Sequence, residues 1–174
     1  MVKFCISREK RRYKLEDLYV ETQQRAKQLL YQLIKNEDIP LLNYTFRFFF
    51  DYYVGENEIL VLPHHFSGRK IEGLTVIDEL GVSISYEAEN PITKQNFTLC
   101  HELGHFLLKH EGGYFAESVY SKDSQIEREA NIFSAFILMP DIVLLSKIYY
   151  ACHTFEEVQI SLGVSKEALS YRLI

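Results

Sequence analysis

The sequence has few cysteines and no long apolar run, and each shortage argues against a class of protein. Its three cysteines, Cys5, Cys100 and Cys152, are widely spaced without a CxxC pair, so neither a disulfide framework nor a cysteine metal site is indicated. No apolar run approaches the ~20 residues that span a membrane. Charged residues also interrupt the N-terminus before an apolar secretory region can form. We therefore expect a soluble, cytoplasmic protein without a membrane partner.

The chain also has fewer basic than acidic residues. The chain has 19 Lys and Arg against 24 Asp and Glu, which gives a net charge of -5 at pH 7. Broad contact with a phosphate backbone needs a basic surface, so direct nucleic-acid binding is not expected. A short basic cluster at residues 8–14 is interpreted as a solvated, partly disordered end of the chain.

The hydrophobic pattern predicts an α+β domain. Apolar residues from Leu15 to Leu33 recur at helical spacing and predict an amphipathic helix of about 20 residues. The pattern of residues 41–54 fits helix or strand, and their length favours a helix. Short apolar runs at 59–62, 74–77 and 82–86 predict a small sheet of about three strands. Helices are then predicted over residues 94–110, 124–138, 141–150, 154–162 and 165–173.

The strongest chemical signal is the run His101-Glu102-Leu103-Gly104-His105, an HExxH pattern inside a predicted helix. Histidines four residues apart share one face of a helix, so both imidazoles can bind one ion. Glu102 lies about 100° round the helix axis from His101, where it can act as general base toward a water held by the ion. The helix is apolar nearly all round and is expected to be buried. A metal ion would offset the cost of burying these polar groups.

A catalytic zinc site needs a third protein ligand and one open position. Glu127 on the next predicted helix is the candidate, with Asn131 on the same face to hydrogen-bond a ligand histidine. Ser124 and Glu127 also fit a capping box, in which case Glu129 would be the ligand. The pattern thus predicts one Zn2+ per chain, held by the two histidines and Glu127, with Glu129 as the alternative.

Some further residues are candidates for contact with a substrate. The oxyanion that develops during hydrolysis needs a donor beyond the metal, and Tyr114, Tyr120 and His153 are candidates for it. An exposed strand edge just before the motif helix could pair with an extended substrate, although an ordinary sheet strand is the other interpretation. The residues of that candidate strand are Val82, Ser83, Ile84, Ser85 and Tyr86.

Three ordered motifs resemble those of the ImmA/IrrE family of metallopeptidases. They are residues 96–105 (NFTLCHELGH), 127–133 (EREANIF) and 137–140 (ILMP). The family pattern is FTLxHELGH followed by ExEANxFAxxLLMP, so the match is close over residues 96–140 and looser from about residue 37 to the end. Ser134 and Phe136 replace smaller residues that are usual there, and residues 1–36 have no family counterpart.

The resemblance implies a compact, gluzincin-like (zincin-like) fold over residues 37–174, preceded by an N-terminal basic segment and amphipathic helix over residues 1–36. It also implies His101, His105 and Glu127 as metal ligands and Glu102 as catalytic base. Members are typically encoded by bacteria, phages or mobile elements, and several cleave a helix-turn-helix repressor. The expected activity is therefore zinc-dependent hydrolysis of a DNA-binding repressor, which would relieve gene silencing.

Two interpretations without catalysis also fit parts of the sequence. Residues 154–173 have the spacing of a helix-turn-helix, but three glutamates there outnumber Lys166 and Arg172. A helix that reads DNA should display basic residues, so packing against the rest of the domain is favoured. The alternative function is a catalytically silent regulatory or binding module that retains the metallopeptidase fold.

Overall fold

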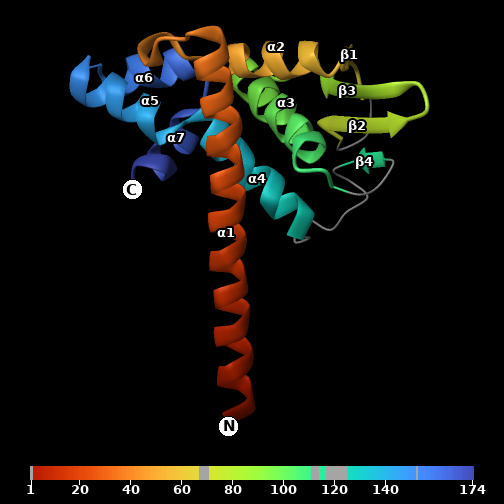
Figure 1. Cartoon of the computed structure of the whole chain (residues 1–174), viewed down its shortest axis with the longest axis vertical. Coiled ribbons are helices and arrows are strands. Elements are labelled where there is room, and N and C mark those ends of the chain that lie inside the picture. The colour runs from red at the N-terminus through yellow and green to blue at the C-terminus, as the bar shows by residue number, and fades with distance from the viewer. Residues whose placement is uncertain (1, 67–70, 111–113, 117–124, 152) are drawn as a thin grey trace.

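The fold is α+β, as the sequence predicts (Figure 1). The computed structural model describes residues 2–66, 71–110, 114–116, 125–151 and 153–174, with side chains described for all of these except residues 2–15 and 114–116. The helices of this part of the chain are α1 (Val2–Glu37), α2 (Phe46–Glu56), α3 (Ile92–Leu107), α4 (Gln125–Leu138), α5 (Asp141–Leu145), α6 (Phe155–Leu162) and α7 (Lys166–Leu173), with a 3-10 turn η1 (Leu41–Asn43) and a π-helical turn η2 (Ser146–Tyr150). The strands are β1 (Leu60–His64), β2 (Gly73–Asp78), β3 (Gly81–Glu87) and β4 (Tyr114–Ala116).

The strands form one mixed sheet in the order β1-β3-β2-β4. β1 runs parallel to β3, whereas β2 is antiparallel to both β3 and β4. The three runs predicted as strands correspond to β1, β2 and β3. The short β4 lies within the segment after the motif helix, where three residues are too few to show the alternation that identifies a strand.

The expectation of an exposed, substrate-pairing edge just before the motif helix is wrong. β3 contains that candidate strand and is an interior strand, paired with β1 on one side and β2 on the other. Its backbone N–H and C=O groups are therefore engaged within the sheet. The residues affected by this correction are Val82, Ser83, Ile84, Ser85 and Tyr86.

α3 lies between the sheet and α4 (Figure 1). Every residue from Thr98 to His105 is buried, in agreement with the expectation from its apolar pattern. Gly104 permits the close approach of the two helices, because a Cβ at this position would lie 2.9 Å from Cδ1 of Phe133 on α4. Because α3 is enclosed by the sheet on one side and α4 on the other, the side chains of the HExxH turn are held by their neighbours.

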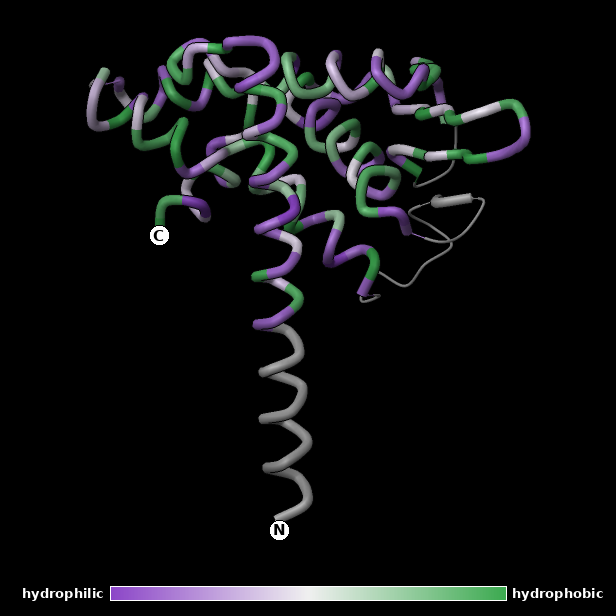
Figure 2. The backbone as a smooth tube through the Cα atoms, in the orientation of Figure 1, coloured by the Kyte–Doolittle hydropathy of each residue, from purple (hydrophilic) through white to green (hydrophobic). Residues whose placement is uncertain are grey.

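The C-terminal half of α1 packs on α4 and continues the core. Its buried residues follow the predicted helical spacing and are Thr22, Ala26, Leu29, Leu30 and Leu33. Figure 2 shows hydrophobic and hydrophilic residues alternating along this part of the helix. The helix begins at Val2 and is longer than predicted. Two buried tyrosines fasten the neighbouring helices, since Tyr53 donates to the Leu29 carbonyl (2.8 Å) and Tyr44 donates to that of Ile137 (2.7 Å).

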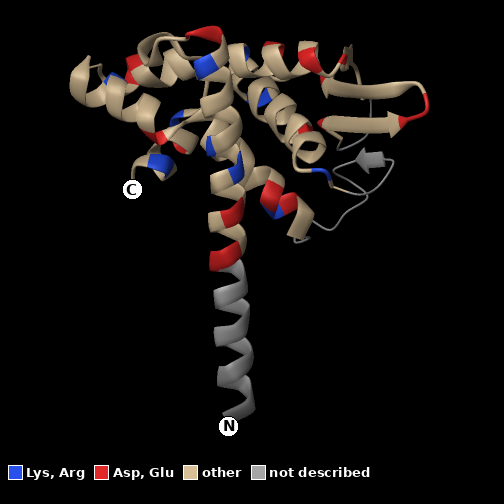
Figure 3. Ribbon diagram, viewed as in Figure 1, with Lys and Arg blue, Asp and Glu red and all other residues tan. Residues whose placement is uncertain are grey.

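One segment, Gln125–Tyr150, is long and apolar enough to cross a membrane by length and composition alone. This finding departs from the expectation that no apolar run approaches the length that spans a membrane, because the segment has 26 residues and a mean hydropathy of 1.7 over its most apolar window. However, 56% of its most apolar window is buried inside the domain, and Pro140 separates α4 from α5 within it. Acidic and basic residues are interspersed along the described helices and strands (Figure 3). A largely buried core helix meets the same criteria of length and composition.

Candidate metal centre

Three side chains from α3 and α4 converge on one point, and we call His101, His105 and Glu127 the ligand cluster. Nε2 of His101 lies 3.0 Å from Nε2 of His105 and 3.2 Å from Oε2 of Glu127. Nε2 of His105 lies 3.5 Å from Oε1 of Glu127. All three residues are buried, with exposed fractions of 6%, 2% and 5%. The helical spacing predicted for the two histidines therefore produces the expected convergence.

The dimensions of the ligand cluster fit a tetrahedral metal ion. Donor atoms placed ~2.0–2.1 Å from one tetrahedral ion lie about 3.3 Å from one another. The two imidazole nitrogens lie 3.0 Å apart, and the Glu127 carboxylate approaches them at 3.2 Å through Oε2 and 3.5 Å through Oε1, all close to that value. Two imidazole nitrogens with one carboxylate form a donor set used by catalytic zinc, which leaves a fourth position open. The residues present can therefore hold a metal ion.

The second nitrogen of each cluster histidine has its own partner. Nδ1 of His101 lies 3.1 Å from Oδ1 of Asn131, the contact expected from the sequence. Nδ1 of His105 lies 2.9 Å from Nδ1 of His110, and Nε2 of His110 lies 2.8 Å from Oε2 of Glu129. Among the described residues, Glu129 is joined to the cluster through His110, whereas Glu127 belongs to the cluster itself.

In the metal-binding protonation state, one arrangement of protons satisfies the two Nδ1 contacts and directs the Nε2 lone pair of each cluster histidine toward the shared point. His101 then carries its proton on Nδ1 and donates to Asn131. His105 donates from Nδ1 to His110, which in turn donates from Nε2 to the Glu129 carboxylate. Such contacts fix the tautomer and the ring orientation of a metal ligand. The chain Glu129–His110–His105 therefore prepares His105 to bind a cation.

The pKa values within the ligand cluster also favour the metal-binding protonation states. Burial, reinforced by the nearby His101, lowers the pKa of His105 to about 3. Burial would raise the pKa of Glu127, but a hydrogen bond from His101 and the neighbouring histidine charges lower it below its ordinary value. At neutral pH His105 is therefore neutral and Glu127 is ionised, which are the states that bind a metal.

The lowered pKa of His105 predicts acid sensitivity of the metal-free protein. An unfolded histidine binds a proton below about pH 6.5, whereas folded His105 stays neutral until about pH 3. The unfolded state therefore gains protons first, and the free energy of unfolding should fall as the pH drops from about 6.5. Urea unfolding of chelator-treated protein at pH 7.5, 6.5 and 5.5 measures this. A His105→Gln variant should show a flatter profile, and equal profiles would contradict the assignment.

The side chain of Glu102 packs against β2, which holds it in place. The hydroxyl of Thr75 donates to Oε2 of Glu102 at 2.7 Å and lies 3.1 Å from the Glu102 carbonyl oxygen. Both side chains are buried, with Thr75 fully enclosed. Gly73 faces the same carboxylate, because a Cβ there would lie 2.7 Å from Oε1 and 2.8 Å from Cγ of Glu102. Two residues of β2 therefore fix the carboxylate beside the HExxH turn.

A methyl group at Gly73 should displace Glu102. In Gly73→Ala the new Cβ would also lie 2.5 Å from Cγ2 of Thr98, and overpacking of this kind costs about 1–3 kcal/mol. We expect urea unfolding to show that loss together with reduced hydrolysis. Gly55→Ala is the matched control, because its Cβ would meet nothing within 4 Å in α2. Equal stability and activity of the two variants would contradict the packing argument.

The candidate oxyanion donors are not assembled by the described structure. Tyr114 belongs to β4, but its side chain is outside the described part of the chain, as is all of Tyr120. His153 lies just before α6, near Glu157, and is not a member of the ligand cluster. Ser124, which would form the capping box with Glu127, also lies outside the described residues.

Three residues of the site escaped the sequence interpretation, namely Gly73, Thr75 and His110. His110 is the last residue of the helix predicted over residues 94–110, and the sequence pattern assigns it no role in the site. Lys109 adopts a left-handed conformation (φ 58°) that turns the chain back, so that His110 returns to the last helical turn. The sequence did contain a signal for this residue, because His110 is a third histidine only five residues after the HExxH motif. Gly73 and Thr75 carry no local signal, because their role depends on how β2 packs on α3.

The family model of the IrrE N-terminal-like domain (Peptidase M78) matches residues 55–174 of this chain. The matched span begins at the end of α2 and contains all four described strands, the HExxH turn and Glu127. α1 lies outside it. No curated protein matches the chain.

Proposed function

The chain belongs to the IrrE N-terminal-like family of M78 peptidases, and from this premise we propose that it is a zinc-dependent endopeptidase. One observation carries the proposal: the convergence of His101, His105 and Glu127 in a buried cluster beside Glu102. Two histidines and a carboxylate are a donor set typical of catalytic zinc, and the adjacent glutamate supplies a base.

The chain's own residues would divide the work of hydrolysis as follows. Zinc, when bound, would polarise the carbonyl of the scissile peptide and make the attacking water more acidic. Glu102 would take a proton from that water as its oxygen adds to the carbonyl carbon, and would deliver the proton to the amide nitrogen as the C–N bond breaks. Thr75 keeps the Glu102 carboxylate in one orientation, and Asn131 and His110 orient the two ligand imidazoles.

For the substrate we propose a helix-turn-helix repressor, cleaved in the cytoplasm of a bacterium or in a host that carries the gene on a phage or mobile element. The support is the resemblance of residues 96–140 to metallopeptidases that act on such repressors. Cleavage would separate the DNA-binding part of the repressor from the rest and so release the genes it silences.

The test is incubation of the zinc-loaded protein with a panel of purified helix-turn-helix repressors. Mass spectrometry of the products should identify one or a few cut sites, and a chelator should prevent cleavage until zinc is restored. Unrelated soluble proteins of similar size serve as the control panel. If the zinc-loaded chain cuts neither panel, the peptidase proposal fails and the catalytically silent binding module is supported.

A further inference from the structure

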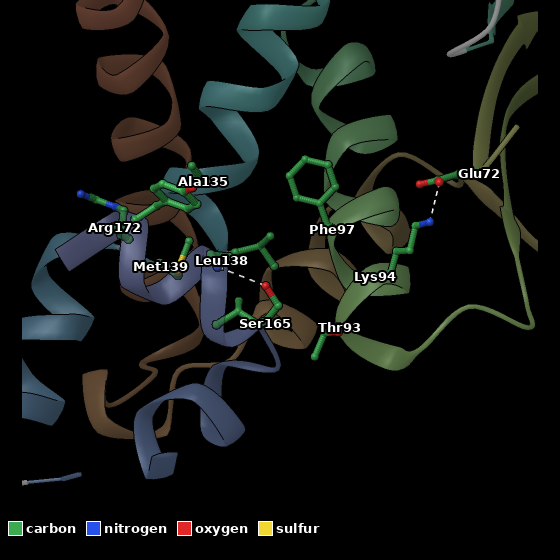
Figure 4. Close-up of a pocket in the computed structure, with 12 residues that line it drawn as sticks. Glu72, Thr93, Lys94, Phe97, Ala135, Leu138, Met139, Ser165 and Arg172 are labelled. Carbon is green, nitrogen blue, oxygen red and sulfur yellow. Dashed lines mark hydrogen bonds and ion pairs between the residues drawn. The ribbon is translucent and has the colours of Figure 1, made fainter. Parts of the chain in front are cut away.

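A cavity of about 560 Å³ opens between α3, α4 and α7, and we call it the α7 cavity (Figure 4). Its walls are mostly apolar, with an ion pair between Lys94 and Glu72 at one side. The main apolar side chains around it are Phe97, Leu138, Met139, Val164, Ala168 and Tyr171. This volume lies within the ~300–1,000 Å³ typical of ligand pockets. It has no role in the hydrolysis described above.

The α7 cavity continues the face of α3 and α4 that carries the ligand cluster. On α3 this face contains, at intervals of four residues, Thr93, Phe97, His101 and His105. On α4 it contains, at the same interval, Glu127, Asn131 and Ala135. The first two residues of the α3 series line the cavity and the last two belong to the cluster, while on α4 the cavity is lined by Ala135.

The two sites also touch. The ring of Phe97 lies 6.0 Å from the ring of His101, measured between centroids, and Figure 4 shows Phe97 projecting from α3 toward the cavity. Four residues of helix rise about 6 Å, so the cavity begins about one helical turn from the cluster and extends about one turn further.

The mouth of the α7 cavity exposes large apolar side chains. Phe97 is 41% exposed, and Tyr171 on α7 is 82% exposed. Adjacent exposed apolar side chains beside a cavity are typical of binding sites. The cations that line the cavity are each paired with a carboxylate, since Lys94 pairs with Glu72 and Arg172 pairs with Asp141. The surface therefore favours an apolar guest over a charged one.

We propose that the α7 cavity receives a short apolar segment of the substrate polypeptide, with one or two large aliphatic or aromatic side chains. An extended peptide advances about 3.3 Å per residue, so a chain held at the ligand cluster would place these side chains about two to four residues from the cleaved bond. This inference rests on the proposed function, because the cluster is what fixes the position of the peptide.

The probes for this proposal are short peptides with a metal-binding hydroxamate at either end. In each series one position, two to four residues from the hydroxamate, carries either Phe or Ser, and the remaining positions carry Gly. Affinity is measured for the zinc-loaded protein and does not require catalysis. We expect Phe at one or more positions to improve affinity at least 10-fold over the matched Ser probe, in the range of ~10–200-fold seen for small apolar differences in a pocket.

The variant Ala168→Phe should fill the cavity from α7 and abolish the preference for Phe. Ser170→Phe is the matched control, because Ser170 is exposed on the same helix and does not line the cavity. Tyr171→Ala removes an exposed side chain from the mouth and should reduce the preference even if Ala168→Phe does not fold. Zinc affinity should be the same in all folded variants.

Several results would overturn the proposal. Equal binding of all Phe and Ser probes, or no binding of any probe to zinc-loaded protein, would do so. A preference that survives in both Ala168→Phe and Tyr171→Ala would assign it to another surface. Self-association of the wild type that Ala168→Phe abolishes would make a second copy of the chain the occupant. Failure to cleave any repressor contradicts the proposed function alone, because the binding assay is independent of cleavage.

Discussion

Replacement of Glu102 by glutamine is expected to abolish peptide hydrolysis while the protein stays folded and keeps its metal. The amide retains the shape of the side chain and can still accept the hydrogen bond from Thr75, but it cannot take a proton from water. Loss of a general base lowers the rate by roughly 10²–10⁴-fold. The measurement is the rate of repressor cleavage, together with zinc content and the thermal unfolding midpoint.

A matched control separates the loss of the base from the loss of a negative charge. Glu79→Gln makes the same chemical change at an exposed residue of the turn between β2 and β3 and should leave cleavage unchanged. Cleavage at the wild-type rate by Glu102→Gln would remove Glu102 from the mechanism. Loss of zinc together with loss of activity would instead make it part of the metal-holding structure.

Replacement of Glu127 by alanine should abolish stoichiometric zinc binding, whereas the same change at Glu129 should only weaken it. Glu127 supplies a donor atom 3.2 Å from Nε2 of His101, inside the ligand cluster. Glu129 acts on His105 through His110, and loss of a partner of this kind typically costs 10–100-fold in metal affinity, as an order-of-magnitude figure. Competition with a zinc-specific chelating dye measures both affinities.

Comparison of these two glutamates decides between the ligands that the sequence left open. His110→Phe should resemble Glu129→Ala, because both interrupt the same chain of hydrogen bonds to His105. If Glu129→Ala loses zinc and Glu127→Ala retains it, the assignment of the ligand is reversed. Wild-type affinity in both Glu129→Ala and His110→Phe would show that this chain of contacts does not orient His105.

Local patterns predicted the parts of the molecule that depend on helical periodicity. The i, i+4 spacing of His101 and His105 placed both rings on one side of α3, and the apolar residues around them predicted a buried helix. The spacing of Glu127 and Asn131 likewise predicted that both would face α3 from α4.

Features that depend on how strands and helices meet could not be predicted in this way. The alternation of Val82, Ile84 and Tyr86 identifies a strand, but it does not say whether the strand is at an edge, and β3 proved to be interior. The support of Glu102 by Thr75 joins residues 27 positions apart. Gly104 allows α3 and α4 to approach closely, but its partner Phe133 is identified only by the packing of α4.

The most direct test of the metal centre is a crystal structure of zinc-soaked protein, with anomalous data collected on both sides of the zinc absorption edge. A single strong peak should lie ~2.0–2.1 Å from Nε2 of His101, Nε2 of His105 and one carboxylate oxygen of Glu127. A map from zinc-saturated crystals with no peak among these three side chains, or with its peak at another group, would contradict the account.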